Sequence, residues 1–184
     1  MSDAALPDLS HPMRTADLSP SQSYPVSLAP EKGQLEVLAR LLDILKVEKL
    51  RFEGKLAPVG KRDWRLTGKL GATVTQRCVV TLEPVKTRID TDLHRLYVAD
   101  LDEDAEMEAL EDTHGEEVEA LGAVIDVGLA VQEELALALP AYPRKDDAPE
   151  TAQQFAAEGT EPMTDEDVKP FAGLKALRDK MQKG

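Results

Sequence analysis

The side chains most often used in catalysis and metal binding are few in this sequence. The histidines are His11, His94 and His114, and the single cysteine is Cys78. No histidine has a second histidine or a cysteine at metal-ligand spacing, and one thiol cannot form an intramolecular disulfide. Zinc binding by His94 with Cys78 is a remote alternative to a half-buried strand histidine and a core thiol. We therefore expect no catalytic residues, no cofactor and no metal, and we predict that the chain is not an enzyme.

Basic side chains are concentrated in one part of an acidic chain. The 184 residues carry 22 Lys and Arg against 35 Asp and Glu, a net charge of −13, which argues against a uniformly basic nucleic-acid-binding domain. Residues 49–95 nevertheless hold eleven bases and five acids, a local excess of +6, whereas residues 100–120 hold eleven acids and no Lys or Arg. The acidity therefore belongs to one tract and the tails rather than to the basic segment.

Strand periodicity gives these bases a common direction. From Trp64 to Val74 the even positions are mainly apolar and the odd positions are polar or charged, which is typical of a strand with one face in the core. The candidate contacts for RNA phosphate or another partner are Arg65, Lys69, Arg77, Lys86 and Arg88. The alternative is an ordinary solvated face whose bases pair with the acidic tract of the same chain.

Hydrophobic spacing predicts the elements that carry these side chains. Leucines at steps of three and four predict a helix over residues 31–46, and Asp126 can cap a second helix over residues 126–139 that ends before Pro140. Alternation of period two predicts antiparallel strands near residues 26–28, 47–57, 63–82 and 85–98. The predicted fold class is α+β, an antiparallel sheet with helices packed on one face.

The last of these strands changes phase near His94. The change would bring Leu96 and Val98 to the inner face, and we expect a bulge or a bend of the strand there.

The remaining segments divide the chain. Proline-rich residues 1–24 are predicted to be a flexible arm, residues 25–140 a single domain with an acidic loop at 100–120, and residues 141–163 a linker. Residues 164–184 are predicted to form a short amphipathic helix with a stripe that includes Phe171, Leu174 and Leu177. This helix either docks on its own domain or binds in a partner's groove. With one cysteine, no signal-peptide core and no apolar run of membrane-spanning length, we predict a cytoplasmic protein.

Three short motifs resemble the bacterial YceD family, the large ribosomal RNA subunit accumulation proteins. Residues 75–85, TQRCVVTLEPV, resemble the family's Cys-Gln-Arg-Cys signature with a following proline. Residues 125–140 resemble its acidic and then aliphatic helix ending in Leu-Pro, and residues 169–174, KPFAGL, resemble its Asn-Pro-Phe-Ala-x-Leu tail. Thr75 stands at the family's first cysteine and Lys169 at its asparagine, so this chain cannot carry a two-cysteine metal or redox role through that motif.

The resemblance implies a cytoplasmic, non-enzymatic factor that supports normal levels of large-subunit rRNA through RNA processing or ribosome assembly. In one hypothesis the basic strand face contacts precursor rRNA or a basic ribosomal protein, and the acidic tract screens that face or receives a basic partner. In the other, the protein is an acidic adapter without RNA contact, which uses the tract and the C-terminal helix to bind proteins. Neither hypothesis involves DNA or a membrane.

Overall fold

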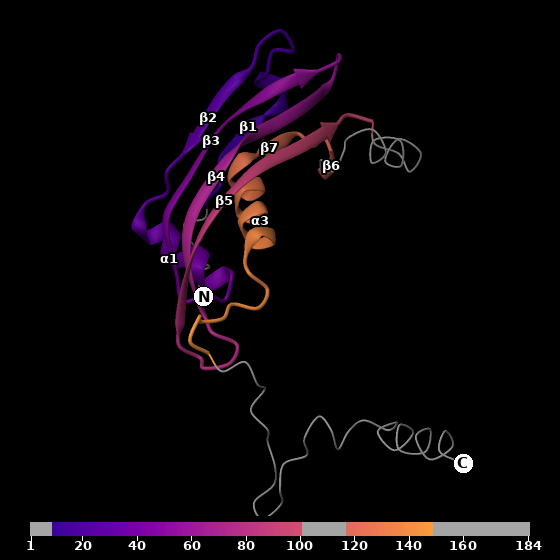
Figure 1. Cartoon of the computed structure of the whole chain (residues 1–184). Coiled ribbons are helices and arrows are strands. Elements are labelled where there is room, and N and C mark those ends of the chain that lie inside the picture. The colour runs from indigo at the N-terminus through magenta and orange to yellow at the C-terminus, as the bar shows by residue number, and fades with distance from the viewer. Residues whose placement is uncertain (1–8, 101–116, 149–184) are drawn as a thin grey trace, which may run out of the picture. The chain divides into compact units, whose positions relative to one another are not determined.

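A five-stranded sheet forms the centre of the structure, a computed structural model that describes residues 9–100 and 117–148 (Figure 1). The strands, in their spatial order, are β2 (Tyr24–Leu28), β3 (Lys46–Val59), β4 (Asp63–Arg77), β5 (Pro84–Val98) and β6 (Glu117–Ala120). The neighbours from β2 to β5 are antiparallel, whereas β6 runs parallel to β5. The α+β class with a mostly antiparallel sheet is therefore confirmed. The expected loop over residues 100–120 is wrong at its end, where β6 forms.

Two α-helices accompany the sheet. Helix α1 (Lys32–Leu41) lies between β2 and β3 in the chain and begins with a capping box formed by Glu31 and Gln34. Helix α3 (Val127–Ala138) is capped by the Asp126 carboxylate, which accepts hydrogen bonds from two backbone N–H groups of the first turn. Figure 1 shows α3 on one side of the curved sheet, where it contacts β4 and β5, while α1 contacts β3. Within the described ranges, no helix has the length and apolar character needed to cross a membrane.

The beginning of the described chain is tied to a segment far along the sequence. Strand β1 (Pro12–Arg14) pairs with β7 (Val124–Asp126) in a separate two-stranded sheet, and a 3₁₀ helix (Thr15–Asp17) follows β1. Leu9 is buried, and a Cβ atom at Gly128 would collide with the Leu9 carbonyl. The structure thus differs from the flexible arm expected over residues 1–24, because residues 12–17 are regular and packed against the domain.

The core lies on the face of the sheet that α3 contacts. The sheet contributes Phe52, Leu56, Leu66, Leu70, Val74 and Leu93, and α3 contributes Val127, Val131 and Leu135. The Phe52 ring lies over two strand glycines, since a Cβ atom would come within 2.7 Å of its Cζ at Gly54 and within 2.5 Å at Gly68. A side chain at either position would compete with this ring for space.

The pairing of β4 with β5 corrects the expected irregularity near His94. The two strands pair continuously from Trp64↔Tyr97 to Arg77↔Pro84, so Arg95 and Tyr97 face the core instead of Leu96 and Val98. The change of phase in the sequence arises because a charged residue, Arg95, is buried at an inward position. The register shift of the sheet lies in β3, between Glu48 and Arg51.

Candidate functional site

The five predicted contact bases project from the sheet face that lies opposite the core. They are Arg65, Lys69, Arg77, Lys86 and Arg88. The three in β4 occupy odd positions, which alternate with the buried even positions. The two in β5 pair with Thr75 and Thr73, which are also odd positions of β4. Because directly paired residues of neighbouring strands point to the same side, all five side chains belong to one outer face.

Strand β3 adds three bases to this outer face. Lys46 pairs with Thr75, Arg51 with Gly71 and Lys55 with Thr67. With these, the outer face of β3, β4 and β5 carries eight bases, and its five acids are Glu48, Glu53, Asp63, Asp90 and Asp92. Sequence reasoning missed Lys46 because the first helix was expected to continue to that residue. Arg51 and Lys55 could have been placed on the outer face from the sequence, because they alternate with the apolar residues Phe52 and Leu56.

Three of the five predicted bases already pair with carboxylates of the same face. Lys69 Nζ lies 3.7 Å from Asp92, Lys86 Nζ lies 3.2 Å from Glu48, and Arg88 Nη2 lies 2.5 Å from Asp90. The hydrogen bond from Arg88 lowers the pKa of Asp90. All of these side chains except the half-buried Glu48 are solvent-exposed, and exposed ion pairs contribute little to stability. A phosphate group could therefore replace the carboxylates without disrupting the fold.

The described ends of the acidic tract contact other bases. Asp100 pairs with Arg62, and Glu117 and Glu119 pair with Arg95. The carboxylates that pair with Lys69, Lys86 and Arg88 thus come from the strands themselves. The alternative of neutralisation by residues 101–116 lies outside the described residues.

A shallow depression marks the middle of the outer face. Its volume is about 330 Å³, and its lining includes Gly71, the bases Arg51, Lys69 and Arg88, and the acids Glu53, Asp90 and Asp92. A Cβ atom at Gly71 would collide with Arg88 Nη2, so the missing side chain lets the Arg88–Asp90 pair lie flat across β4. Guanidinium groups bind phosphate through several N–H donors in one plane. The depression therefore contains donors that suit a phosphate group, but a phosphate there would compete with Asp90 and Asp92 for Arg88 and Lys69.

Arg95 is a buried charge that the sequence did not reveal as such. Its side chain is only 8% exposed and pairs with Glu117 and Glu119 of the β6 strand and with Glu133 of α3. Burial alone would lower its pKa, but the hydrogen bond that Arg95 donates to Glu133 and the charge of Glu117 raise it. Arg95 thus joins β5 to β6 and α3, a structural role on the inner side of the sheet.

Cys78 lies in the turn between β4 and β5 and is completely buried. Its Sγ accepts hydrogen bonds from the backbone N–H groups of Val80 and Thr81, each at 3.4 Å. Hydrogen bonding, first from the Thr81 side chain and then from the backbone, lowers the pKa of the thiol to about 6, although burial opposes this. His94 projects from the outer face opposite Thr67. The described residues contain no group of three or more His, Cys, Asp or Glu side chains able to hold a metal.

The turn that contains Cys78 is braced by the chain that follows α3. Gln76 Nε2 donates to the Pro140 carbonyl at 3.1 Å, and Val79 N–H donates to the Pro143 carbonyl at 2.9 Å. Lys145 Nζ lies 2.5 Å from Glu83. Two of the motifs that resemble the family, residues 75–85 and the Leu-Pro at the end of residues 125–140, are therefore neighbours in space.

The predicted partner-binding helix, with Phe171, Leu174 and Leu177, lies outside the described residues. A protein-family model described as "Large ribosomal RNA subunit accumulation protein YceD" matches residues 66–178. Comparisons with curated proteins and with solved structures found no match. The matched region contains four of the five predicted contact bases, the turn with Cys78, α3 and the C-terminal motif. Because the match covers more than half of the chain, the protein belongs to the YceD family.

Proposed function

We propose that this protein is a non-catalytic cytoplasmic factor that supports the accumulation of large-subunit ribosomal RNA, and that it contacts precursor rRNA through the outer face of β3, β4 and β5. The observation that carries the proposal is the charge of this outer face, with eight bases against five acids in a protein whose net charge is −13. The family description supplies the class of RNA.

The net negative charge of the chain does not exclude this contact. At physiological salt the Debye length is about 8 Å, so charges beyond that distance are largely screened from an exposed site. An RNA strand on the outer face would therefore interact mainly with the local excess of bases. The large aromatic side chains Phe52 and Trp64 are buried, which favours contacts with phosphates over stacking of bases.

The test is the salt dependence of binding between the full chain and a transcribed precursor of large-subunit rRNA. The outer-face variant combines Arg65→Glu, Lys69→Glu and Arg77→Glu. Its matched control combines Arg14→Glu, Lys32→Glu and Arg40→Glu, which changes the net charge equally at exposed residues outside the outer face. Each lost phosphate contact should reduce the slope of log affinity against log salt by about 0.7–0.9, so the outer-face variant should flatten the slope by roughly 2 while the control keeps it.

The rival hypothesis, an acidic adapter that binds proteins without RNA contact, predicts a different result. Such an adapter should lose its partner when residues 165–184 are deleted, and an RNA-binding factor should lose little. Equal slopes for the two triple variants, or no binding of the rRNA precursor at low salt, would reject the outer face as an RNA contact. Recovery of a basic ribosomal protein that depends on residues 165–184 would then favour the adapter.

A further inference from the structure

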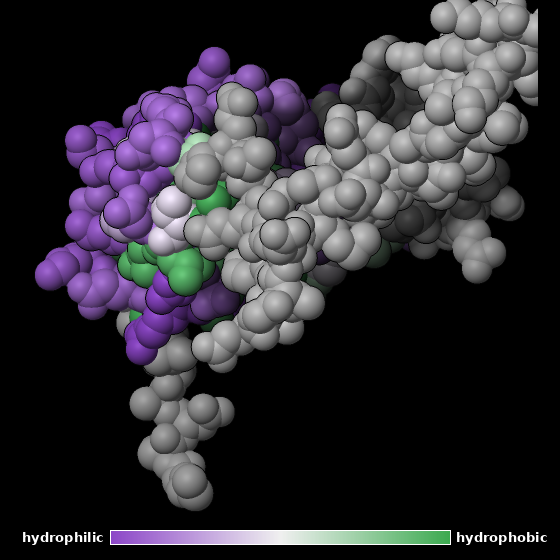
Figure 2. Space-filling view, turned by 60° about the horizontal axis from the view of Figure 1, so that its bottom comes forward, coloured by the Kyte–Doolittle hydropathy of each residue, from purple (hydrophilic) through white to green (hydrophobic). Residues whose placement is uncertain are grey.

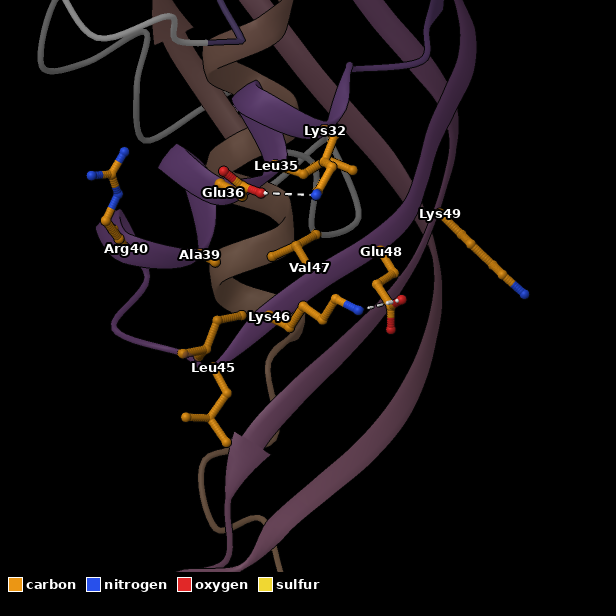
Figure 3. Close-up of a pocket in the computed structure, with 11 residues that line it drawn as sticks. Lys32, Leu35, Glu36, Ala39, Arg40, Leu45, Lys46, Val47, Glu48 and Lys49 are labelled. Carbon is orange, nitrogen blue, oxygen red and sulfur yellow. Dashed lines mark hydrogen bonds and ion pairs between the residues drawn. The ribbon is translucent and has the colours of Figure 1, made fainter.

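A groove separate from the basic outer face lies between helix α1 and the first residues of β3 (Figure 3). Its volume is about 680 Å³. The apolar lining residues are Leu35 and Ala39 of α1, Ile44 and Leu45 of the connection, and Val47 of β3. Figure 2 views the domain from the end that is lowest in Figure 1 and shows apolar surface exposed among hydrophilic residues there. Leu45 is 41% exposed, so part of the apolar lining is open to solvent.

The β3 side of this groove is an open strand edge. Strand β2 reaches only as far as the pair Leu28↔Phe52. Lys46, Val47 and Glu48 pair with β4 on one side, and within the described ranges no strand pairs with them on the other side. In a strand, backbone N–H and C=O groups point alternately to the two sides. The unpaired groups of residues 46–48 therefore face the place where β2 would lie if it were longer.

Helix α1 stands beside this edge but cannot pair with it, because the backbone groups of a helix bond within the helix. The connection from α1 to β3 is fixed at both ends. Ile44 N–H donates to the Ala39 carbonyl at 3.0 Å, and Leu45 N–H donates to the Thr75 carbonyl at 2.9 Å. The groove is therefore bordered by a fixed helix on one side and an unpaired strand on the other, a geometry in which an extended peptide can add a strand.

A bulge sets the length of the open edge. The register of β3 shifts between Glu48 and Arg51, and Lys49 has a positive φ of 53°. Figure 3 shows the Lys49 side chain directed away from the other lining residues. Because a bulge interrupts regular pairing, an added strand would pair over residues 46–48, before the bulge.

The charged residues that line the groove indicate which kind of segment could bind there. Its lining includes the bases Lys32, Arg40, Lys46 and Lys49 against the acids Glu36 and Glu48. Both acids are already paired, Glu36 with Lys32 at 3.6 Å and Glu48 with Lys46 at 2.8 Å. Lys32 and Lys46 are neutralised by these pairs, and Figure 3 shows Lys49 directed away from the other lining residues, so an acidic segment would meet mainly the charge of Arg40.

From these observations we propose that the groove between α1 and the open edge of β3 binds an extended acidic peptide of a partner protein as an added strand. Backbone hydrogen bonds to residues 46–48 hold the peptide, apolar side chains at alternate positions contact Leu35, Leu45 and Val47, and acidic side chains lie near the basic rim. The inference does not depend on RNA binding by the outer face, because the peptide would bind the open backbone edge of β3, although Lys46 and Glu48 border both surfaces.

The test begins with the full chain and a display library of random ten-residue peptides. The expected result is enrichment of peptides that combine acidic and apolar residues. A selected peptide should lose at least tenfold in affinity when alternate backbone amides are methylated, because these can no longer donate to β3. The affinity of the unmodified peptide should fall at least tenfold for the variants Leu45→Glu and Lys46→Glu. Its affinity for the control variant Lys61→Glu should stay within twofold, because Lys61 is an exposed base in the β3–β4 turn outside the groove.

Three outcomes would overturn the proposal. The first is a selection without acidic peptides, and the second is a set of peptides that bind Leu45→Glu as well as the unchanged chain. The third is slow hydrogen exchange of the outward amides within residues 46–48 in the protein without peptide, because the edge would then be covered already. In that case dependence of the protection on protein concentration would identify a second copy, and independence would identify a segment of the same chain.

Discussion

The guanidinium group of Arg88 lies directly over Gly71 of the neighbouring strand. A Cβ atom at position 71 would collide with Arg88 Nη2 and lie 3.0 Å from Asp90 Oδ1. Asp90 is the direct cross-strand partner of Gly71, so the Arg88 side chain reaches along β5 and over β4 to meet it. A glycine thus allows an arginine and an aspartate to form a flat pair at the centre of the basic outer face.

Replacing Gly71 with alanine should separate this pair without unfolding the sheet. The colliding atoms are at the ends of flexible side chains, which can move, so we expect stability to remain within about 1 kcal/mol of the parent. The pKa of Asp90 is held down by the hydrogen bond from Arg88, and it should rise in Gly71→Ala. Carboxyl-detected NMR titration measures it. The control is Gly33→Ala, where the added Cβ has no neighbour within 4 Å; an unchanged Asp90 pKa in Gly71→Ala would contradict the packing described.

A methyl group at Gly68 should be much more disruptive. Its Cβ would lie 2.5 Å from Phe52 Cζ and 2.7 Å from the Glu53 carbonyl oxygen, and neither the buried ring nor the backbone can move easily. Overpacking of this kind destabilises by about 2 kcal/mol. Urea unfolding of Gly68→Ala measures the loss. The double variant Gly68→Ala with Phe52→Leu should show non-additive effects, because both changes act on the same space; strict additivity would argue against the ring contact.

Arg95→Met should destabilise the protein and loosen β6. The change removes the partner of Glu117, Glu119 and Glu133, and we expect a loss of about 2 kcal/mol because these carboxylates remain partly exposed and can regain water. Denaturant unfolding gives the free energy, and hydrogen exchange of residues 117–120 reports on β6. Lys69→Met, which breaks the exposed pair with Asp92, should change stability by less than about 0.5 kcal/mol. If Arg95→Met and Lys69→Met lowered the free energy of unfolding equally, the buried ion pairs of Arg95 would contribute no more to stability than the exposed pair of Lys69.

Stability should depend on pH through Cys78. The folded protein holds the pKa of this thiol at about 6, below the value of about 8.5 typical of an unfolded chain. Between these values the unfolded state binds more protons, so the contribution of the thiolate is fully present above about pH 9 and is lost as the pH falls through 6. Unfolding midpoints under reducing conditions at pH 6, 7.5 and 9 should therefore rise more steeply with pH for the parent than for Cys78→Ser. Parallel curves for the two proteins would show that the folded thiol is not ionised.

The long strands and the direction of their bases could be predicted because their alternation is regular. In β4 the even positions from Trp64 to Val74 face the core, and this parity alone placed Arg65, Lys69 and Arg77 on one face. The pairing of β3 with β4 could not be obtained in this way. It depends on the bulge between Glu48 and Arg51, whose position is set by contacts across strands rather than by spacing within one.

Short elements and buried charges escaped prediction for physical reasons. Strands β1, β6 and β7 have three or four residues each, too few for a period to be recognised, and their partners are remote or parallel. Arg95 was misread because apolar Leu96 and Val98 beside it suggested the opposite face, while the glutamates that neutralise it lie on β6 and α3. The groove between α1 and β3 could not be predicted from the sequence, because it exists only where β2 ends and leaves the first residues of β3 without a neighbouring strand on that side.

The pairing of β1 with β7 determines when the N-terminal part of the domain can reach its native position during translation. His11 N–H donates to Asp126, which is 115 residues further along the chain, and the same carboxylate caps α3. During synthesis at about 5–20 residues per second, β1 leaves the ribosome roughly 6–20 s before its partner strand. The earliest part of the domain to be translated is thus among the last to reach its native position, and premature termination before β7 would leave that segment without its native partner.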